Sequence, residues 1–431
     1  MITDDDEHVL AYLRTRLGES RDAELLLADL AGRLAVASDS GSDTKDVASG
    51  NTNGTKENDT NTSTNNSLLQ PLRLSKIGLV PVGDTGCTSV AIMDGLPLAV
   101  IGTTGGRLVT CELKAGSGPG AVVSSVRGHV GAVSAITPWT QGVVSAGRDG
   151  QIRVWRWRNG QDLSTGESNG GPGLHLVRSW VAHVSGVSDL SQDAAATKDS
   201  SRRLLASCSR DGTVKIWDPE ERTATLVATL TPHGLQVWIR SVVLHGSCLV
   251  TGGHDGRVIL VYWTKTGQTV QLSSVQAHQT PVESVTLSLH AHTNMPRLGF
   301  EHIVSTGRDN TAVLWKIGTP RFKPGTNEPL PSISSSQRTF TRLSTLKGHG
   351  SWVRKAYVLS HSINPSSLSI ITCSDDGSIR LWDTSLIQAR QLMVWDNIHS
   401  NCFINAFDID EIQKCFITIA ADGNAALFSI R

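Results

Sequence analysis

Residues 147–155 read GRDGQIRVW, and this stretch decides the fold. Its Asp149-Gly150 pair predicts a two-residue hairpin turn, because glycine readily adopts the positive φ that such a turn requires. The residues that follow alternate between apolar and polar side chains and end at Trp155, six residues after the aspartate. This alternation is typical of a short, half-buried strand that leaves the turn.

The same spacing of aspartate, glycine or asparagine, and tryptophan returns along the chain. Complete copies are Asp211-Gly212 with Trp217, Asp309-Asn310 with Trp315, and Asp376-Gly377 with Trp382. Looser copies are Asp255-Gly256 with Val261, Asp422-Gly423 with Phe428, and Gly105-Gly106 with Cys111. The turns at positions 105, 149, 211, 255, 309, 376 and 422 therefore predict seven units.

A histidine in a turn precedes each complete copy, and an alternating strand follows the histidine. These histidines are His129, His183, His278 and His349, with weaker versions at His233 and His399. One such sheet has two apolar faces and cannot be stable alone. Several sheets packed face to face in a ring bury both faces and leave only short edges.

These residues closely resemble the WD-repeat family, whose unit runs about 40–45 residues between a Gly-His and a Trp-Asp pair. Trp217-Asp218 and Trp382-Asp383 match the second pair literally. The resemblance covers roughly residues 72–431 and implies an all-β, seven-bladed β-propeller. It also implies a buried hydrogen-bond chain in each blade. The structural residues carried over are His129, Ser145, Asp149, Trp155, His183, Ser207, Asp211, Trp217, His278, Ser305, Asp309, Trp315, His349, Thr372, Asp376 and Trp382.

Three regions are predicted along the chain. Residues 1–36 form a short helical segment, because leucines recur there at helical spacing, and residues 37–70 form a disordered linker rich in Ser, Asn and Thr. Residues 71–431 form the propeller, in which Leu72 to Val80 supplies the missing outer strand of the last blade and closes the ring. Insertions at 159–173 and 321–338 fall between the third and fourth strands of blades two and five.

Composition argues against several classes of function. The chain has 39 basic and 39 acidic residues, so neither nucleic acid nor an anionic membrane is an expected partner. The acidic N-terminus is not a signal peptide, which indicates cytoplasm or nucleus. His290 and His292, with His302 nearby, lack a supporting carboxylate or cysteine pattern. We therefore expect no metal, no cofactor and no enzymatic activity.

One end of the ring carries the residues expected to bind a partner. The position before each turn aspartate is expected to face solvent there, and it holds Arg148, Arg210 and Arg308. Trp238, Arg240, Trp352 and Arg354 begin inner strands at the same end. Arginine and aromatic side chains favour an acidic or phosphorylated protein segment. The alternative is that these arginines are solvated or pair with neighbouring carboxylates.

The predicted function is a non-enzymatic protein–protein interaction scaffold, as a subunit of a multiprotein complex. One alternative is a substrate receptor of a ubiquitin ligase complex, although the Trp-Asp-x-Arg sequence common in such receptors is absent. An enzyme with a channel active site is the other alternative. Residues 1–36 resemble the LisH dimerisation motif at Tyr12-Leu13, Gly18, Ala23 and Leu26, with spacing that differs by one residue. Oligomerisation through these helices and docking of a partner on them both remain open.

Overall fold

The computed structural model describes residues 74–83, 86–113, 120–160, 171–195, 203–219, 224–263, 269–288, 300–318, 340–360, 368–384 and 389–430. The predicted helical segment 1–36 and linker 37–70 lie outside these residues, and their boundaries stay predictions. His290, His292, the predicted insertion 321–338 and most of the insertion 159–173 also lie outside them.

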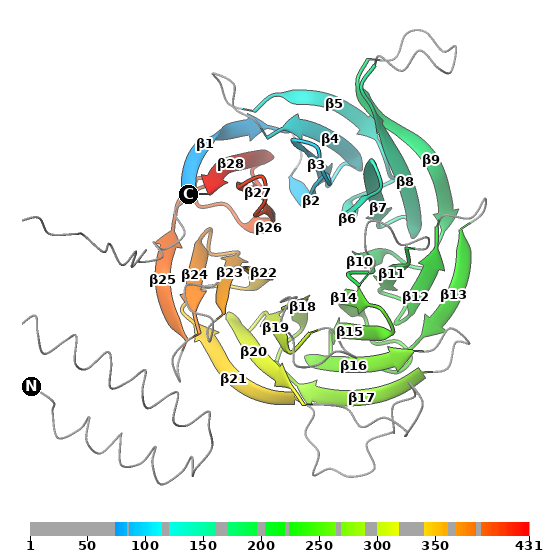
Figure 1. Ribbon diagram of the computed structural model, residues 1–431, viewed down its shortest axis with the longest axis vertical. Helices are drawn as coiled ribbons and strands as arrows, with labels where there is room; N and C mark the ends of the chain where they lie inside the picture. Colours follow the sequence, from blue (N-terminus) through cyan, green and yellow to red (C-terminus); the bar gives the residue numbers. More distant parts are fainter. Residues whose placement is uncertain are drawn as a thin grey trace, which may run out of the picture. The chain divides into compact units, whose positions relative to one another are not determined.

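Within the described residues, 28 strands form seven antiparallel sheets of four strands each (Figure 1). Blades one to four consist of β2 (Cys87–Ile92), β3 (Leu98–Thr103), β4 (Arg107–Glu112) and β5 (Val122–Arg127); β6 (Val133–Trp139), β7 (Gly142–Gly147), β8 (Gln151–Arg158) and β9 (Gly173–Val181); β10 (Val187–Gln192), β11 (Leu205–Ser209), β12 (Val214–Asp218) and β13 (Thr225–Leu230); and β14 (Ile239–His245), β15 (Cys248–Gly253), β16 (Arg257–Trp263) and β17 (Thr269–Gln276). Blades five to seven consist of β18 (Val282–Leu287), β19 (His302–Gly307), β20 (Thr311–Ile317) and β21 (Phe340–Lys347); β22 (Val353–Val358), β23 (Ser369–Ser374), β24 (Ile379–Asp383) and β25 (Arg390–Trp395); and β26 (Ile404–Asp410), β27 (Cys415–Ala420), β28 (Asn424–Ile430) and β1 (Leu74–Pro81).

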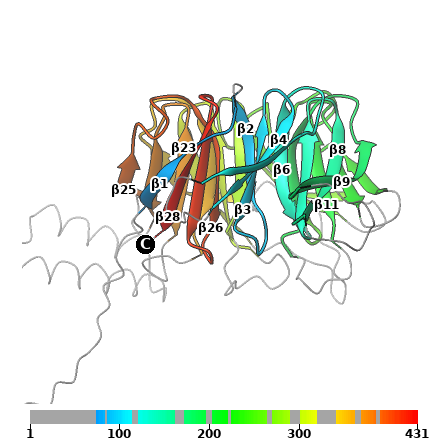
Figure 2. The same cartoon turned by 90° about the horizontal axis from the view of Figure 1, so that it is seen from above.

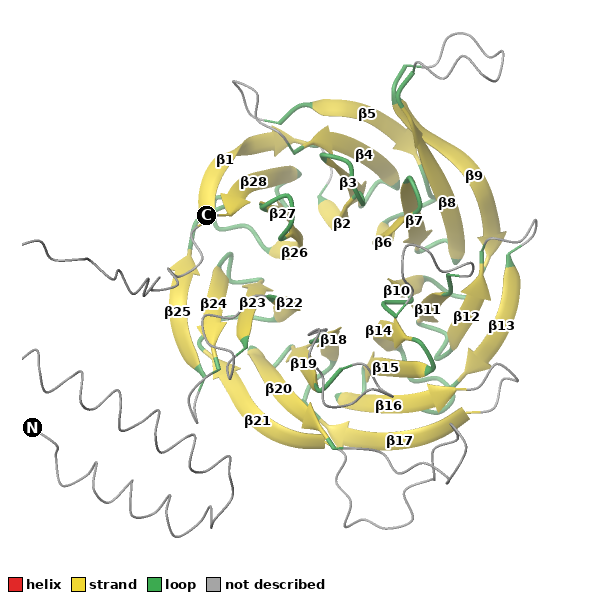
Figure 3. Ribbon diagram, in the orientation of Figure 1, coloured by secondary structure: helices red, strands yellow, loops and turns green. Residues whose placement is uncertain are grey.

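The seven sheets form a closed ring, which confirms the predicted seven-bladed propeller (Figure 3). The first strand of each blade lies innermost, and each inner strand packs beside the inner strand of the next blade, including β26 beside β2. From the side the sheets form one layer, with the strand ends at two opposite faces of the ring (Figure 2).

The ring closes between the two ends of the propeller sequence. Strand β1 pairs antiparallel with β28, from Leu74 opposite Ile430 to Pro81 opposite Asn424. The last blade thus receives its outer strand from the segment that precedes blade one, as the sequence predicted for residues 72–80. Closure of this kind leaves neither the first nor the last blade with an exposed sheet face.

The turn between the second and third strands has the same backbone geometry in every blade. The residue at the position of Gly150 has a positive φ in all seven blades, between 64° and 80°: Gly106, Gly150, Gly212, Gly256, Asn310, Gly377 and Gly423. The loop from Gly147 to Gln151 contains three residues, with the amide of Gly150 donating to the carbonyl of Gly147 at 3.2 Å. The sequence predicted a two-residue loop, and this prediction was wrong by one residue. A three-residue loop ending in the left-handed region is the next most common hairpin connection.

The hydrophobic core consists of seven clusters, one between each pair of neighbouring blades in the described part of the chain. Between blades one and two, for example, Leu108 packs with Val143 and Trp155. The second strands are buried along their length, as β7 illustrates, except for the half-buried first residues of β19 and β27, because both of their faces meet a neighbouring sheet. Burial on both faces is the physical reason that the sheets form a ring.

Buried polar groups also join the inner strands of neighbouring blades. The Asp189 carboxylate accepts bonds from the Ser241 hydroxyl at 2.8 Å and the Val242 amide at 3.1 Å, across blades three and four. The Asp408 carboxylate accepts the Ile92 amide at 2.7 Å, which joins blade seven to blade one. Burial raises the pKa of both carboxyl groups. Sequence reasoning did not identify these two residues, because each pairs with a blade distant in the sequence.

No helix within the described ranges is long and apolar enough to cross a membrane.

We expect Val80→Asp to destabilise the ring far more than Leu79→Asp. Val80 is 1% exposed and packs in the cluster that joins blades seven and one, whereas its neighbour in β1, Leu79, is 40% exposed. Burial of an unpaired carboxylate should lower the free energy of unfolding by roughly 3 kcal/mol or more. The Leu79 change should cost about 1 kcal/mol or less. Urea unfolding measures both, and equal losses would contradict the packing of β1 in the closed ring.

Candidate functional site

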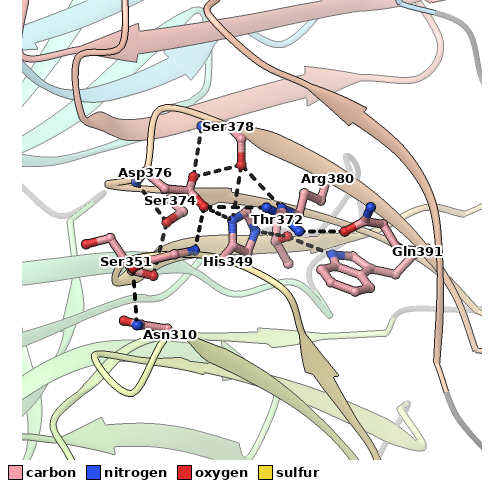
Figure 4. A network of polar contacts seen from close by, with 11 residues as sticks. Asn310, His349, Ser351, Thr372, Ser374, Asp376, Ser378, Arg380 and Gln391 are labelled. Carbon is pink, nitrogen blue, oxygen red and sulfur yellow. Dashed lines mark hydrogen bonds and ion pairs between the residues drawn. The ribbon is translucent and has the colours of Figure 1, made fainter.

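Blade six shows how the repeated polar residues are arranged (Figure 4). Nδ1 of His349 lies 2.9 Å from the Asp376 carboxylate, and its Nε2 lies 2.7 Å from the Thr372 hydroxyl. Nε1 of Trp382 donates to the same hydroxyl at 2.8 Å. Since that hydroxyl accepts from the indole, it donates to Nε2, and Nδ1–H donates to the carboxylate. The donors and acceptors balance only if the imidazole is neutral.

The same four-residue chain forms in the three other blades for which the sequence predicted it. Nδ1 of His129, His183 and His278 lies 3.0 Å from Asp149, Asp211 and Asp309 respectively. The serine hydroxyls of Ser145, Ser207 and Ser305 lie within 2.9 Å of Nε2. They accept the indole N–H of Trp155, Trp217 and Trp315 at 2.9, 2.9 and 3.0 Å. The structure therefore brings all sixteen predicted structural residues together in four sets.

Two blades carry a shorter form of this chain. His233 bonds Asp255 at 3.1 Å and Thr251 at 3.0 Å, while His399 bonds Asp422 at 3.1 Å and Thr418 at 2.8 Å. Val261 and Phe428 replace the tryptophan, so no indole bonds the threonine in these blades. The sequence indicated both histidines but neither threonine, because the missing tryptophan removes the signal that locates the hydroxyl.

Opposing effects set the charges of these pairs. Burial lowers the pKa of His349 more than its bond to Asp376 raises it, so the ring stays neutral. Burial would raise the pKa of Asp376, but bonds from His349, Ser378 and the Gly350 amide outweigh it and hold that pKa far below its usual value. The His349–Asp376 pair thus joins a neutral imidazole to an ionised carboxylate.

The residue before each turn aspartate lies at one common end of the ring. Its amide donates to the carbonyl of the residue that precedes the inner strand, as Arg308 does to Pro281 at 3.2 Å. The same bond occurs in all seven blades, with Gly105 in place of the aspartate in blade one. It runs from Thr104, Arg148, Arg210, His254, Arg308, Asp375 and Ala421 to Gly86, Ala132, Gly186, Trp238, Pro281, Trp352 and Phe403, respectively. We call this end of the ring the turn face.

A buried carboxylate organises the arginines of the turn face. Glu283, at the start of β18, is paired with Arg240 at 2.6 Å, with Nε of Arg308 and with Arg354 at 3.4 Å. Arg354 also forms a two-pronged bond with Asp375, at 2.6 and 2.7 Å. Burial would raise the pKa of Glu283, but the three arginines lower it, so the group is ionised.

Two tryptophans lie among these arginines. The guanidinium carbons of Arg240 and Arg210 are 4.3 and 4.9 Å from the ring centroid of Trp238. Those of Arg308 and Arg354 are 4.0 and 5.1 Å from the centroid of Trp352. Cation–π contacts at such distances are favourable by about 0.5–2 kcal/mol each. We call the set Arg210, Trp238, Arg240, Glu283, Arg308, Trp352, Arg354 and Asp375 the arginine cluster.

Six of the seven predicted partner-binding residues thus converge, and Arg148 does not. Arg148 is exposed and forms no ion pair or cation–π contact with any residue that the structure describes. Sequence reasoning missed Glu283, which occupies the same register position as Arg240 and Arg354 in the neighbouring blades. An alignment of the repeats would have shown this order of arginine, glutamate and arginine in blades four to six.

The described residues contain no group of three or more His, Cys, Asp or Glu side chains placed to hold a metal ion.

We expect Asp376→Ala to lower the free energy of unfolding by about 1–3 kcal/mol, because it leaves His349 and the Gly350 amide without an acceptor. Asp94→Ala is the matched control, since Asp94 is exposed and should lose less than about 0.5 kcal/mol. Thermal and urea unfolding measure both variants. An Asp376 variant as stable as the control would show that the buried chain contributes nothing to stability.

We expect His349→Gln to flatten the loss of stability in acid. The folded-state pKa of His349 lies below 6.5, so the unfolded chain takes up a proton near pH 6.5 while the folded chain does not. Acid therefore favours unfolding, by at most about 1.4 kcal/mol per pH unit for this group. Urea unfolding above and below that pH should show a shallower slope for the variant than for the unmodified protein. Parallel slopes would mean that His349 titrates alike in both states.

Comparisons with known proteins agree with this architecture. The family model described as WD domain, G-beta repeat matches residues 120–156, 174–218 and 340–383. The nuclear distribution protein PAC1 of Zygosaccharomyces rouxii is 31% identical over 362 residues, which cover 79% of this chain and 73% of that protein. Those of Candida glabrata and Saccharomyces cerevisiae are each 28% identical, over 75% and 76% of this chain and 67% and 63% of their own lengths. With seven blades closed into a ring, the chain belongs to the WD-repeat family of β-propeller proteins.

Proposed function

We propose that this protein is a non-enzymatic interaction scaffold, a subunit of a multiprotein complex that binds a partner segment on its turn face. A WD-repeat propeller is consistent with such a role. The observation that carries the proposal is the arginine cluster, because arginine and tryptophan side chains gathered on one face are the composition of protein-binding hot spots.

The charge of the cluster favours an acidic or phosphorylated partner segment. The cluster holds four guanidinium groups, of Arg210, Arg240, Arg308 and Arg354, against the two carboxylates of Glu283 and Asp375. Positive charge therefore exceeds negative charge in the cluster, and an anionic side chain of a partner would reduce this imbalance.

Glu283 reconciles the two interpretations of these arginines. Its carboxylate neutralises part of their charge, as expected if the arginines pair with neighbouring groups. It also holds Arg240, Arg308 and Arg354 in fixed positions before any partner binds. Fixed side chains lose less conformational freedom on binding, which favours affinity.

Exposed apolar side chains lie on the same face. Val130 and Val184 directly follow the histidines of blades two and three, and Leu235 lies two residues after that of blade four. They are 69%, 95% and 81% exposed, respectively. Exposed apolar residues on the face that carries the arginine cluster are typical of a protein-binding surface.

The names of the relatives suggest the process in which the scaffold acts. Three relatives are named nuclear distribution proteins. We propose a role in nuclear distribution for this chain, in the cytoplasm or nucleus. Oligomerisation through residues 1–36 stays a prediction.

We expect reversal of Arg148 and Arg210 to glutamate in one chain to reduce partner capture at least about tenfold, since these two arginines are exposed. The control reverses Arg156 and Arg390, which are also exposed, on β8 and β25, and changes the net charge equally. Proteins captured from a lysate by each form are quantified by mass spectrometry. Equal capture by the turn-face variant and the control would refute binding at this face.

A further inference from the structure

Phe403 occupies the same position in blade seven as Trp238 and Trp352 in blades four and six. Each is the last residue before its inner strand, β26, β14 or β22. Each also accepts, through its carbonyl, the amide of the residue before the turn aspartate: Ala421 to Phe403 at 3.1 Å, His254 to Trp238 at 2.8 Å and Asp375 to Trp352 at 3.0 Å. The turn face therefore carries three aromatic side chains at equivalent places.

The surroundings of these aromatic rings differ. Arginines cover Trp238 and Trp352, and the His254 ring stacks on Trp238 with centroids 5.5 Å apart and planes 10° apart. Phe403 faces an alanine at the corresponding place and has no aromatic or cation–π contact with the part of the chain that the structure describes. It remains 55% exposed. A phenylalanine without such contacts thus stands where the other two blades have a tryptophan in contact with arginines.

The loop that carries Phe403 is both strained and firmly held. Asn397, Ser400 and Asn401 have φ values of 56°, 52° and 62°, which side-chain-bearing residues rarely adopt. The buried bonds of His399 and the bond from the Lys76 amine to the Ile398 carbonyl at 3.2 Å fix this loop to β27, the last turn and β1. Backbone strain persists only where the surroundings enforce it, and it gathers at binding sites. The loop therefore presents Phe403 in a fixed place.

We propose that Phe403 is an apolar contact for the partner segment, which then carries a large apolar side chain beside its acidic residues. This inference rests on the proposed function, and it extends the binding face from the arginine cluster to blade seven. Inner strands β22 and β26 lie side by side, so the acidic and apolar contacts fall on neighbouring blades. An apolar occupant is favoured over a cation because phenylalanine is a weaker cation–π partner than tryptophan, and because the cluster repels basic segments.

The test uses synthetic peptides, so that no partner need be known. The probes are three fluorescein-labelled peptides: hexaglutamate, hexaglutamate with one phenylalanine at its N-terminus, and hexaglutamate with one phenylalanine at its C-terminus. Binding is measured by anisotropy at low ionic strength. We expect a phenylalanine-bearing peptide to bind the unmodified protein about tenfold more tightly than hexaglutamate. Phe403→Ala should remove this advantage and leave the affinity for hexaglutamate unchanged.

The control is Ile412→Ala, because Ile412 is 95% exposed in the same blade but lies in the turn between β26 and β27, at the opposite end of the inner strand. It should keep the advantage of phenylalanine. Two results would overturn the inference while leaving arginine-dependent binding intact. One is equal affinity of the unmodified protein for hexaglutamate and the phenylalanine-bearing peptides. The other is a phenylalanine advantage that survives in the Phe403 variant when its melting temperature is unchanged. If neither peptide binds the unmodified protein, the acidic-partner proposal fails and the inference with it.

Discussion

Burial of both faces of every sheet is the constraint on which this structure depends. The second strand of each blade is buried on both sides, so a blade is stable only between two others, and seven clusters fill the seven junctions. A chain of blades meets this requirement at its two ends only by closing on itself. Strand β1 completes blade seven, so the segment before blade one and the last strand belong to one sheet. Ring closure is thus a consequence of apolar burial rather than an addition to it.

The polar chains of histidine, hydroxyl and aspartate act within that constraint. Each fixes the loop before an inner strand to the turn between the second and third strands, as His349 does through Asp376. Because both loops lie on the turn face, the bond that stabilises the blade also positions the residues that face solvent. The backbone amide of the residue before the aspartate is held in every blade, while the type of its side chain varies from blade to blade. Threonine, arginine, histidine, aspartate and alanine all occur there with the same backbone bond.

Glu283 gives the turn face its particular character. A buried carboxylate is unfavourable unless it is paired, and here three guanidinium groups share it. The arrangement spans blades four, five and six, so it also ties neighbouring sheets together at their inner strands. The remaining positive charge and the tryptophans flanked by arginines lie on blades three to six of this face, and the exposed Phe403 lies on blade seven.

The repeated spacing in the sequence was enough to predict seven blades, the sixteen residues of the four complete hydrogen-bond chains and the strand that closes the ring. Those features are local or periodic. A given residue type at a given place in the repeat serves the same structural role in each blade that carries it. The tertiary structure alone decided which charges meet. Asp189, Asp408 and Glu283 form bonds with residues of other blades. The spacing of residues within one repeat cannot predict a contact between two repeats. The turn was also one residue longer than the Asp-Gly pair suggested, because glycine fixes the sign of φ but not the length of the loop.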